Sequence, residues 1–158
     1  MGVLYSQDDA LEEAEERVAE IFGSPGQRTG TVPFQQYTGY YDREMGHDVK
    51  RFFLSLGGSF QRGALAEAKL ATNRIERDMA LSGRRVVNLD PGLLTPESLI
   101  LATTKPYYHR IYLAKGIYAE LTLIFRKGSY EPLRWTYPDY REEWTRRFFN
   151  DVRKGILV

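Results

Sequence analysis

The second half of this chain carries a hairpin pattern that limits the folds open to it. Two strand-like segments, residues 108–113 and 117–126, are joined by Ala114-Lys115-Gly116. The turn decides which side chains share a face, because a slip of one residue moves every side chain to the opposite face. A two-residue turn would place His109 opposite Thr122. A three-residue loop with a left-handed Gly116 separates apolar from polar side chains better, so we predict that loop.

In this register Arg110 lies directly opposite Glu120, an arrangement that favours a cross-strand ion pair. One face of the predicted hairpin is apolar and carries Ile111, Leu113, Ile117, Ala119, Leu121, Leu123 and Phe125. The other face is polar and carries Tyr108, Arg110, Tyr112, Tyr118, Glu120 and Thr122. We expect His109 at the edge of the apolar face, where a satisfied, partly buried histidine and a catalytic base are both open interpretations.

The rest of the chain alternates strand-like and helix-like segments. Helical periodicity follows the apolar piece Val3–Ser6, with Ser6 or Asp8 as the cap and Gly23 as the stop, and recurs over about 62–80. Strands are predicted at 49–56 and 85–88, and Asp90-Pro91-Gly92 suits a type II turn. Thr95-Pro96-Glu97 predicts the start of a short helix, and Asp139 with Glu142 resembles a capping box that opens a last helix.

This succession predicts an α+β fold in one domain covering residues 1–158. The simplest architecture is a ferredoxin-like β-α-β-β-α-β unit, extended by a short helix, a C-terminal β-hairpin and a final helix.

Composition removes several classes of chemistry. The 158 residues include no cysteine and only two histidines, His47 and His109, so neither a thiolate centre nor a multi-histidine metal site is expected within one chain. No metal site is therefore predicted, and the cofactor stays unknown. No signal peptide or apolar run of membrane-spanning length is present, so we expect a cytoplasmic protein without a membrane partner.

Six motifs carry a resemblance to a known family over essentially the whole chain. They are Lys69-Leu70-Ala71-Thr72-Asn73, Val87-Asn88-Leu89-Asp90-Pro91-Gly92, Ala102-Thr103-Thr104-Lys105, His109-Arg110-Ile111-Tyr112-Leu113, Gly116-Ile117-Tyr118-Ala119-Glu120 and Trp135-Thr136-Tyr137-Pro138-Asp139-Tyr140. In these motifs the chain resembles a bacterial family catalogued as domain of unknown function 4416. The resemblance implies no activity. Some members carry the label "GTP-binding protein", but this sequence has no G-x-x-x-x-G-K-[ST] phosphate loop.

Polar and ionisable residues from two loops and one hairpin face are the candidate site. The candidate catalytic residues are Glu120, Asp90 and His109. The candidate ligand-binding residues are Asn88, Lys105, Arg110, Tyr118, Thr122, Lys69 and Asn73. We expect an open polar face that binds a small anionic molecule, a phosphorylated or carboxylated metabolite or a nucleotide, through Lys105 and Arg110. A structural alternative remains, in which Arg110 and Glu120 are an ion pair and Asn88 and Asp90 hold a turn.

A protein- or RNA-interaction module is the alternative function. Twelve of the 21 aromatic residues lie between Tyr107 and Phe149, interleaved with arginines and lysines, which is compatible with nucleic-acid binding. A net charge of +1 falls short of the basic footprint of a dedicated nucleic-acid binder, so nucleic acid is the less favoured partner. The oligomeric state does not follow from the sequence.

Overall fold

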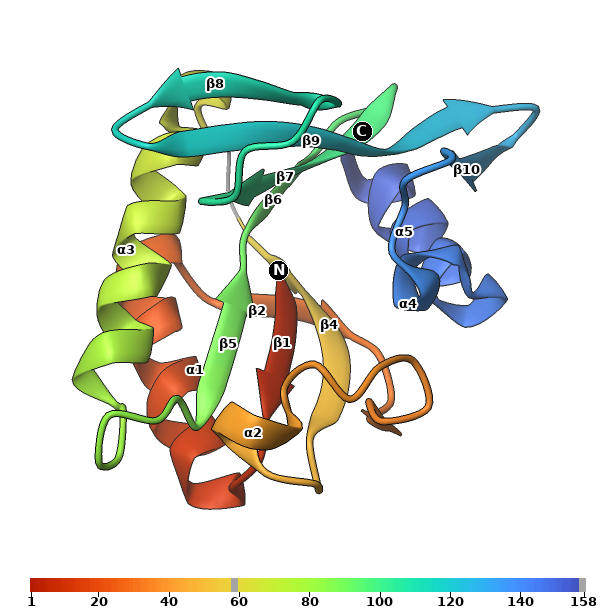
Figure 1. Cartoon of the computed structure of the whole chain (residues 1–158). Helices are drawn as coiled ribbons and strands as arrows, with labels where there is room; N and C mark the ends of the chain where they lie inside the picture. The colour runs from red at the N-terminus through yellow and green to blue at the C-terminus, as the bar shows by residue number, and fades with distance from the viewer. Residues whose placement is uncertain (58–59, 157–158) are drawn as a thin grey trace. The chain divides into compact units, whose positions relative to one another are not determined.

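Helices and two antiparallel sheets make up the chain, as a computed structural model shows for residues 1–57 and 60–156 (Figure 1). The predicted α+β class is therefore confirmed. The chain divides into two compact units. The first unit comprises Met1–Ser59 and Leu70–Asp90, and the second comprises Phe60–Lys69 and Pro91–Val158. The division falls inside helix α3 (Leu65–Asp78), so that helix contributes residues to both units.

The first unit is built on an antiparallel sheet in the order β2-β4-β1-β5, with β3 also paired to β4. Its strands are β1 (Gly2–Tyr5), β2 (Pro25–Arg28), β3 (Val32–Pro33), β4 (Lys50–Leu56) and β5 (Val87–Asp90). Its helices are α1 (Asp8–Phe22), α2 (Asp42–Met45) and the larger part of α3, which the 3₁₀ turn η1 (Arg62–Ala64) precedes. The ferredoxin-like arrangement as such stays a prediction.

Each face of the first sheet has its own neighbours, because alternate side chains of a strand point to opposite faces. One face packs against α1 and α3 in a buried cluster that includes Val3, Phe52, Leu89, Val18 and Ile75. Leu4, on the opposite face, packs with Phe34, Met45 and Val49. Gly23 ends α1 with a φ of 87°, as the sequence predicts, but Gln7 rather than Ser6 or Asp8 occupies the N-cap.

The second unit is built on a sheet in the order β10-β9-β7-β6, with β8 also paired to β9. Its strands are β6 (Gly92–Leu94), β7 (Ser98–Thr103), β8 (Arg110–Ala114), β9 (Ile117–Arg126) and β10 (Ser129–Pro132). β8 pairs with the first half of β9 and β10 with the second half, an arrangement that can be followed in Figure 1. Helices α4 (Pro138–Arg141) and α5 (Glu143–Ile156) lie against β10.

The β8–β9 hairpin has the predicted register but reaches it differently. Arg110 pairs with Glu120 and Tyr112 with Tyr118, as expected. However, Ala114 pairs with Ile117, so the turn contains only Lys115 and Gly116, with φ of 52° and 77°. The register shifts between Tyr112 and Ala114, which makes Leu113 the extra residue of a β-bulge. A two-residue turn and a bulge thus replace the predicted three-residue loop.

Exposure of the two hairpin faces does not follow their division into polar and apolar. On the polar face Glu120 is 2% exposed and Thr122 is fully buried. On the apolar face Ile111 is 72% exposed, and Leu113 and Leu121 are also exposed. The expectation of an open polar face at these two positions is therefore wrong. A pattern of alternating polarity separates two faces, but it does not say which face the rest of the sheet covers.

Three further local expectations are wrong. Thr95 does not open a helix: its hydroxyl accepts hydrogen bonds from the amides of Glu97 and Ser98 and closes the turn between β6 and β7. Gly92 lies in β6 without the positive φ that a type II turn requires, so β5 leads almost directly into β6. The expected last helix is two helices, because Glu142 is extended and separates α4 from α5.

The predicted capping box is also wrong. Tyr137 is the N-cap of α4, and its side chain makes no capping hydrogen bond. Pro138 begins the helix, where its missing amide hydrogen costs nothing. Asp139 is instead buried in the first turn of α4, and its carbonyl accepts a hydrogen bond from the Thr145 hydroxyl, which links α4 to α5. No helix in residues 1–57 and 60–156 is long and apolar enough to cross a membrane.

Candidate functional site

The carboxylate of Glu120 is the centre of a polar cluster in the second unit. One oxygen, Oε2, accepts hydrogen bonds from Arg110 Nε at 2.7 Å and from His109 Nε2 at 3.0 Å. All three side chains are at least nine-tenths buried, which weakens the screening of their charges by water. We call His109, Arg110 and Glu120, with Trp135 and Tyr137 beside them, the hairpin cluster.

Arg110 is held by three different partners. Besides the bond to Glu120, its NH1 donates to the Lys105 carbonyl at 2.9 Å and its NH2 donates to the Tyr137 hydroxyl at 2.8 Å. Burial alone would lower the pKa of Arg110, but the hydrogen bond to Glu120 and the charges of Tyr137 and Glu120 together raise it. Arg110 is therefore a fixed cation that positions Glu120.

His109 lies in the turn before β8 and points to the polar side of the hairpin. The expectation that it borders the apolar face fails because the regular alternation of the strand begins only at Arg110. Its ring stacks on Trp135, with centroids 4.9 Å apart and planes 20° apart, and the rings of Tyr107 and Tyr108 lie 5.8 and 5.0 Å away. The Trp135 indole is fixed in turn by donating to the Leu121 carbonyl at 2.7 Å.

Two buried atoms of the hairpin cluster have no hydrogen-bond partner among the described residues. They are Glu120 Oε1 and His109 Nδ1. A carboxylate only accepts hydrogen bonds, so the imidazole donates through Nε2, and Nδ1 of a neutral ring is then also an acceptor. With a neutral imidazole, the cluster presents two buried acceptors that lack donors among the described residues.

Three other predicted residues of the second unit lie near this cluster with different roles. Lys105 is joined to it through its carbonyl, and its side chain is exposed. Thr122 is structural, because its hydroxyl donates to the Glu120 carbonyl and its carbonyl accepts from the Thr136 hydroxyl. Tyr118 is half-buried and packs edge-to-face on Tyr112, with centroids 5.4 Å apart.

Asn88 and Asp90 belong to the first unit, where they form part of a second polar network. Asn88 Nδ2 donates to Asp90 Oδ2 at 2.9 Å, and Arg51 NH1 lies 3.7 Å from the same oxygen. Asn88 Oδ1 accepts from Arg85 NH1 at 2.7 Å. Because Asp90 ends β5 and no type II turn follows it, this pair does not hold the predicted turn.

Arg85 links this network to two glutamates. It donates to both carboxylate oxygens of Glu44 at 2.6 and 2.7 Å, and it lies 3.2 Å from Glu76 Oε2. The buried Glu76 also accepts from the Leu89 amide at 2.7 Å. The hydrogen bonds to Glu44, and then the charges of Glu76 and Glu44, raise the pKa of Arg85 although burial opposes the rise. We call Glu44, Glu76, Arg85, Asn88 and Asp90 the first-sheet cluster.

The ten predicted site residues therefore fall into groups. Glu120, His109 and Arg110 are in direct contact in the second unit, and Asn88 and Asp90 are in direct contact in the first. Lys69 and Asn73 both lie on α3, the first buried and the second half-buried, and they fall on different sides of the division between the units. A single site for all ten residues stays a prediction.

Almost the whole chain matches one protein family. The family model described as "Domain of unknown function (DUF4416)" matches residues 1–155. The chain belongs to the DUF4416 family. No curated protein and no solved structure matches the chain. Membership of the DUF4416 family supplies no activity, so the function must be argued from the side chains themselves.

Sequence reasoning missed several partners of the predicted residues in this DUF4416 chain. In the first unit these are Glu44 and Arg51, and Arg85 was assigned only to a strand. In the second unit these are Trp135 and Tyr137, which contact His109 and Arg110 respectively. The Trp135-Thr136-Tyr137 motif was the available signal, because it is one of the six motifs of the resemblance. No group of three or more potential metal ligands occurs in the described part of the chain.

Proposed function

We propose that the hairpin cluster binds a small anionic molecule of the bacterial cytoplasm, a phosphorylated or carboxylated metabolite or a nucleotide, that also carries hydroxyl or amino groups. The observation that carries this proposal is the pair of buried acceptors without donors, Glu120 Oε1 and His109 Nδ1. A hydroxyl or amino group is the chemistry that satisfies them.

The unpaired, buried carboxylate oxygen of Glu120 would be costly if the residue were purely structural. An unpaired buried polar group costs about 1–3 kcal/mol, and more when the group is charged. A buried ion pair is often no more stabilising than apolar side chains of the same volume. A carboxylate that keeps one oxygen unpartnered in such surroundings is therefore better explained by a ligand than by stability.

The bond between His109 and Glu120 also suits proton transfer. A carboxylate that accepts the proton of one imidazole nitrogen fixes the tautomer and stabilises the imidazolium that forms when the other nitrogen takes up a proton. Here Glu120 Oε2 holds Nε2–H, and Nδ1 would be the base. In this proposal Nδ1 accepts a proton from the ligand's hydroxyl or amino group.

Lys105 is the residue that we assign to the anionic group. Arg110 already donates to a carboxylate, a carbonyl and a phenol, so it positions Glu120 rather than meeting the ligand. The Lys105 side chain, which carries the ammonium, is exposed, and the backbone carbonyl of Lys105 accepts a hydrogen bond from Arg110.

The rings of Tyr107 and Tyr108 flank His109, and Tyr108 is 84% exposed, so displacement of Tyr108 is the proposed entry route.

A ligand panel tests the proposal on the full chain. Thermal shifts are measured with phosphorylated metabolites, carboxylated metabolites and nucleotides, and the dissociation constant of each hit is then measured by calorimetry. We expect Glu120→Gln and His109→Gln to weaken the hit at least about tenfold, as expected when a buried charge-assisted hydrogen bond is lost. Lys105→Gln should weaken anionic hits only.

Glu131→Gln is the matched control, since Glu131 lies in the same sheet and pairs with Arg126 at its exposed edge. Thermal unfolding without ligand establishes that each variant is folded. The proposal is wrong if no compound shifts the wild-type chain, or if Glu120→Gln binds the hits as tightly as wild type does.

We propose self-association as a second candidate function, the protein-interaction form of the alternative. The observation that favours it is the exposure of apolar side chains on β8, where Ile111 and Tyr112 are 72% and 58% exposed. The only charged residue of β8 is Arg110, and Glu120 neutralises it, so two copies of this edge strand could pair without repulsion.

Light scattering over a range of concentrations should show dimers that Ile111→Lys abolishes. A monomer at all concentrations contradicts the idea, and binding of single-stranded RNA instead would identify the nucleic-acid form of the alternative.

A further inference from the structure

We propose that the second unit also binds an aliphatic carboxylate in an apolar cavity separate from the hairpin cluster. The cavity has a volume of about 490 Å³, and all the residues that line it belong to the second unit. This volume falls in the range of about 300–1,000 Å³ that is usual for small-molecule sites.

The body of the cavity is apolar. Its walls come from the start of α3 and from four neighbouring strands, through Leu65, Leu93, Ile100, Leu113 and Ala119. Leu113, which lines the cavity, is also the extra residue of the β8 bulge. Hydrocarbon is the chemistry that such a lining favours, since burying apolar surface stabilises by roughly 25 cal/mol per Å².

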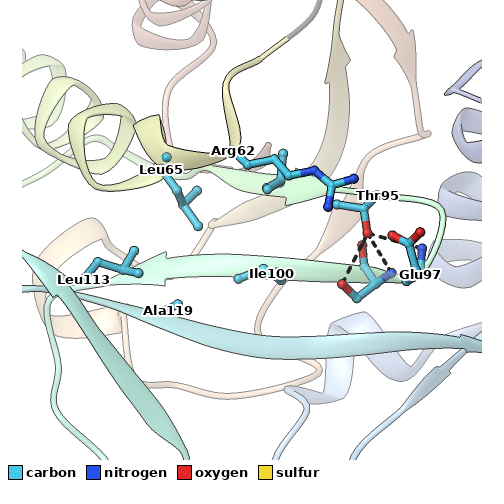
Figure 2. Close-up of a pocket in the computed structure, with 10 residues that line it drawn as sticks. Arg62, Leu65, Thr95, Glu97, Ile100, Leu113 and Ala119 are labelled. Atoms are coloured by element: carbon cyan, nitrogen blue, oxygen red, sulfur yellow. Dashed lines mark hydrogen bonds between the residues drawn. The ribbon is translucent and has the colours of Figure 1, made fainter.

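One end of the cavity carries a cation. Figure 2 shows the Arg62 side chain extending toward Thr95 and Glu97, away from Leu113 and Ala119. Among the described residues, Arg62 has no ion-pair or hydrogen-bond partner. A guanidinium at the end of an apolar cavity is suited to a carboxylate, which it can bind through two parallel hydrogen bonds.

Glu97 does not cancel this preference. Its pKa is lowered first by the hydrogen bond with Thr95, then by its own backbone, and further by the charges of Arg62 and Arg153. Arg153 itself donates to the Pro96 carbonyl at 2.8 Å. Arg62 is the cation of the lining, and the charge of Arg153 also acts on Glu97 from outside it, so the balance of charge favours an anionic head group over an amine.

The probe for this site is octanoate, added to the full chain below its micelle concentration. Calorimetry gives the dissociation constant, and amide chemical shifts report which residues respond, with Gly63, Leu93 and Ile100 expected to move. Octylamine has the same tail with the opposite charge and should bind at least about tenfold more weakly. Acetate, which lacks the tail, should not bind at measurable concentrations.

Arg62→Gln should weaken octanoate about tenfold, because it removes the charge-assisted bidentate contact. Arg134→Gln is the matched control, since it removes an exposed arginine of the same unit away from the cavity. Glu120→Gln should leave octanoate binding unchanged, so this proposal and the proposed function can fail independently. Equal affinity for octylamine and octanoate, or unchanged octanoate binding by Arg62→Gln, would overturn the inference.

Discussion

Arg110 and Glu120 face each other across β8 and β9, with Nε 2.7 Å from Oε2, and the side chain of neither is more than 5% exposed. The pair occupies neighbouring strands at directly opposed positions, so the hairpin register alone sets the distance between the two charges. His109 adds a second donor to the same oxygen. Because the pair is buried, each partner depends on the other for compensation of its charge.

Removal of one partner should therefore be costly. Arg110→Met leaves Glu120 buried without its cation, and we expect a loss of about 3–5 kcal/mol in the free energy of unfolding. The double variant Arg110→Met/Glu120→Leu should lose less than the single variant, because no isolated charge remains. Chemical denaturation measures both.

The matched control is Arg126→Met, which breaks the exposed Arg126–Glu131 pair in the same sheet. An exposed ion pair contributes about 0–1 kcal/mol. Equal losses for Arg110→Met and Arg126→Met would contradict the description of the hairpin cluster as a buried, mutually dependent group.

In the first unit, Arg85 should be the residue on which the first-sheet cluster depends. Arg85→Ala removes one donor from the buried Glu76 and one from the Asn88 amide oxygen. We expect a loss of about 1–3 kcal/mol in the free energy of unfolding, the range for a buried polar group that loses a hydrogen-bond partner. Arg84→Ala, at the exposed neighbouring arginine, should change stability by less than about 0.5 kcal/mol. Thermal or urea unfolding that did not distinguish the two variants would contradict this role.

Tyr130 gives a pH dependence with a definite sign. Its ring is fully buried, its hydroxyl donates to the Thr95 carbonyl, and burial raises its pKa to about 12. The unfolded chain has a tyrosine pKa near 10. Because the folded pKa is the higher one, the contribution to stability is complete below pH 10 and is lost as the pH rises from 10 to 12. Two pKa units correspond to about 2–3 kcal/mol.

Tyr130→Phe separates this effect from the titration of the other tyrosines. The variant should be about 1 kcal/mol less stable than wild type at pH 8, because the Thr95 carbonyl loses its donor. Between pH 10 and 12 it should lose less stability than wild type. Parallel losses in the two proteins over this range would show that Tyr130 does not carry the alkaline transition.

The sequence contains the hairpin register, and the reason is physical. Alternation of side chains with a period of two makes only one of two neighbouring registers separate apolar from polar residues, so Arg110 and Glu120 could be paired without a structure. A two-residue turn with a bulge could not be distinguished from a three-residue loop. Both connections give the same strand pairing from Arg110 to Tyr112.

Long-range partners were beyond prediction. Glu44 and Arg85 are 41 residues apart, and no local pattern connects α2 with the segment before β5. Burial was misjudged for a related reason, since what covers a hairpin face comes from other segments, here residues 135–137, which contact His109, Arg110 and Thr122. Thr95 is a third case, because a threonine hydroxyl can either cap a helix or close a turn. Here it closes the turn between two paired strands, β6 and β7.

The turns of the two hairpins in the second unit give a stabilising prediction. Lys127-Gly128 connects β9 and β10 as Lys115-Gly116 connects β8 and β9, and each lysine has a positive φ, 53° and 52° respectively. A two-residue turn with positive φ at both positions favours asparagine at the first, because lysine has a Cβ and a long side chain that disfavour the left-handed region.

Lys127→Asn should therefore raise the midpoint of thermal unfolding, by an amount equivalent to about 0.5–1 kcal/mol. Gly128→Ala, which places a Cβ at a φ of 85°, should lower it by about 1–2 kcal/mol although nothing crowds that position. Opposite signs at adjacent exposed residues are what backbone conformation predicts. If both substitutions lowered the midpoint, the left-handed geometry of Lys127 would not be the source of the strain.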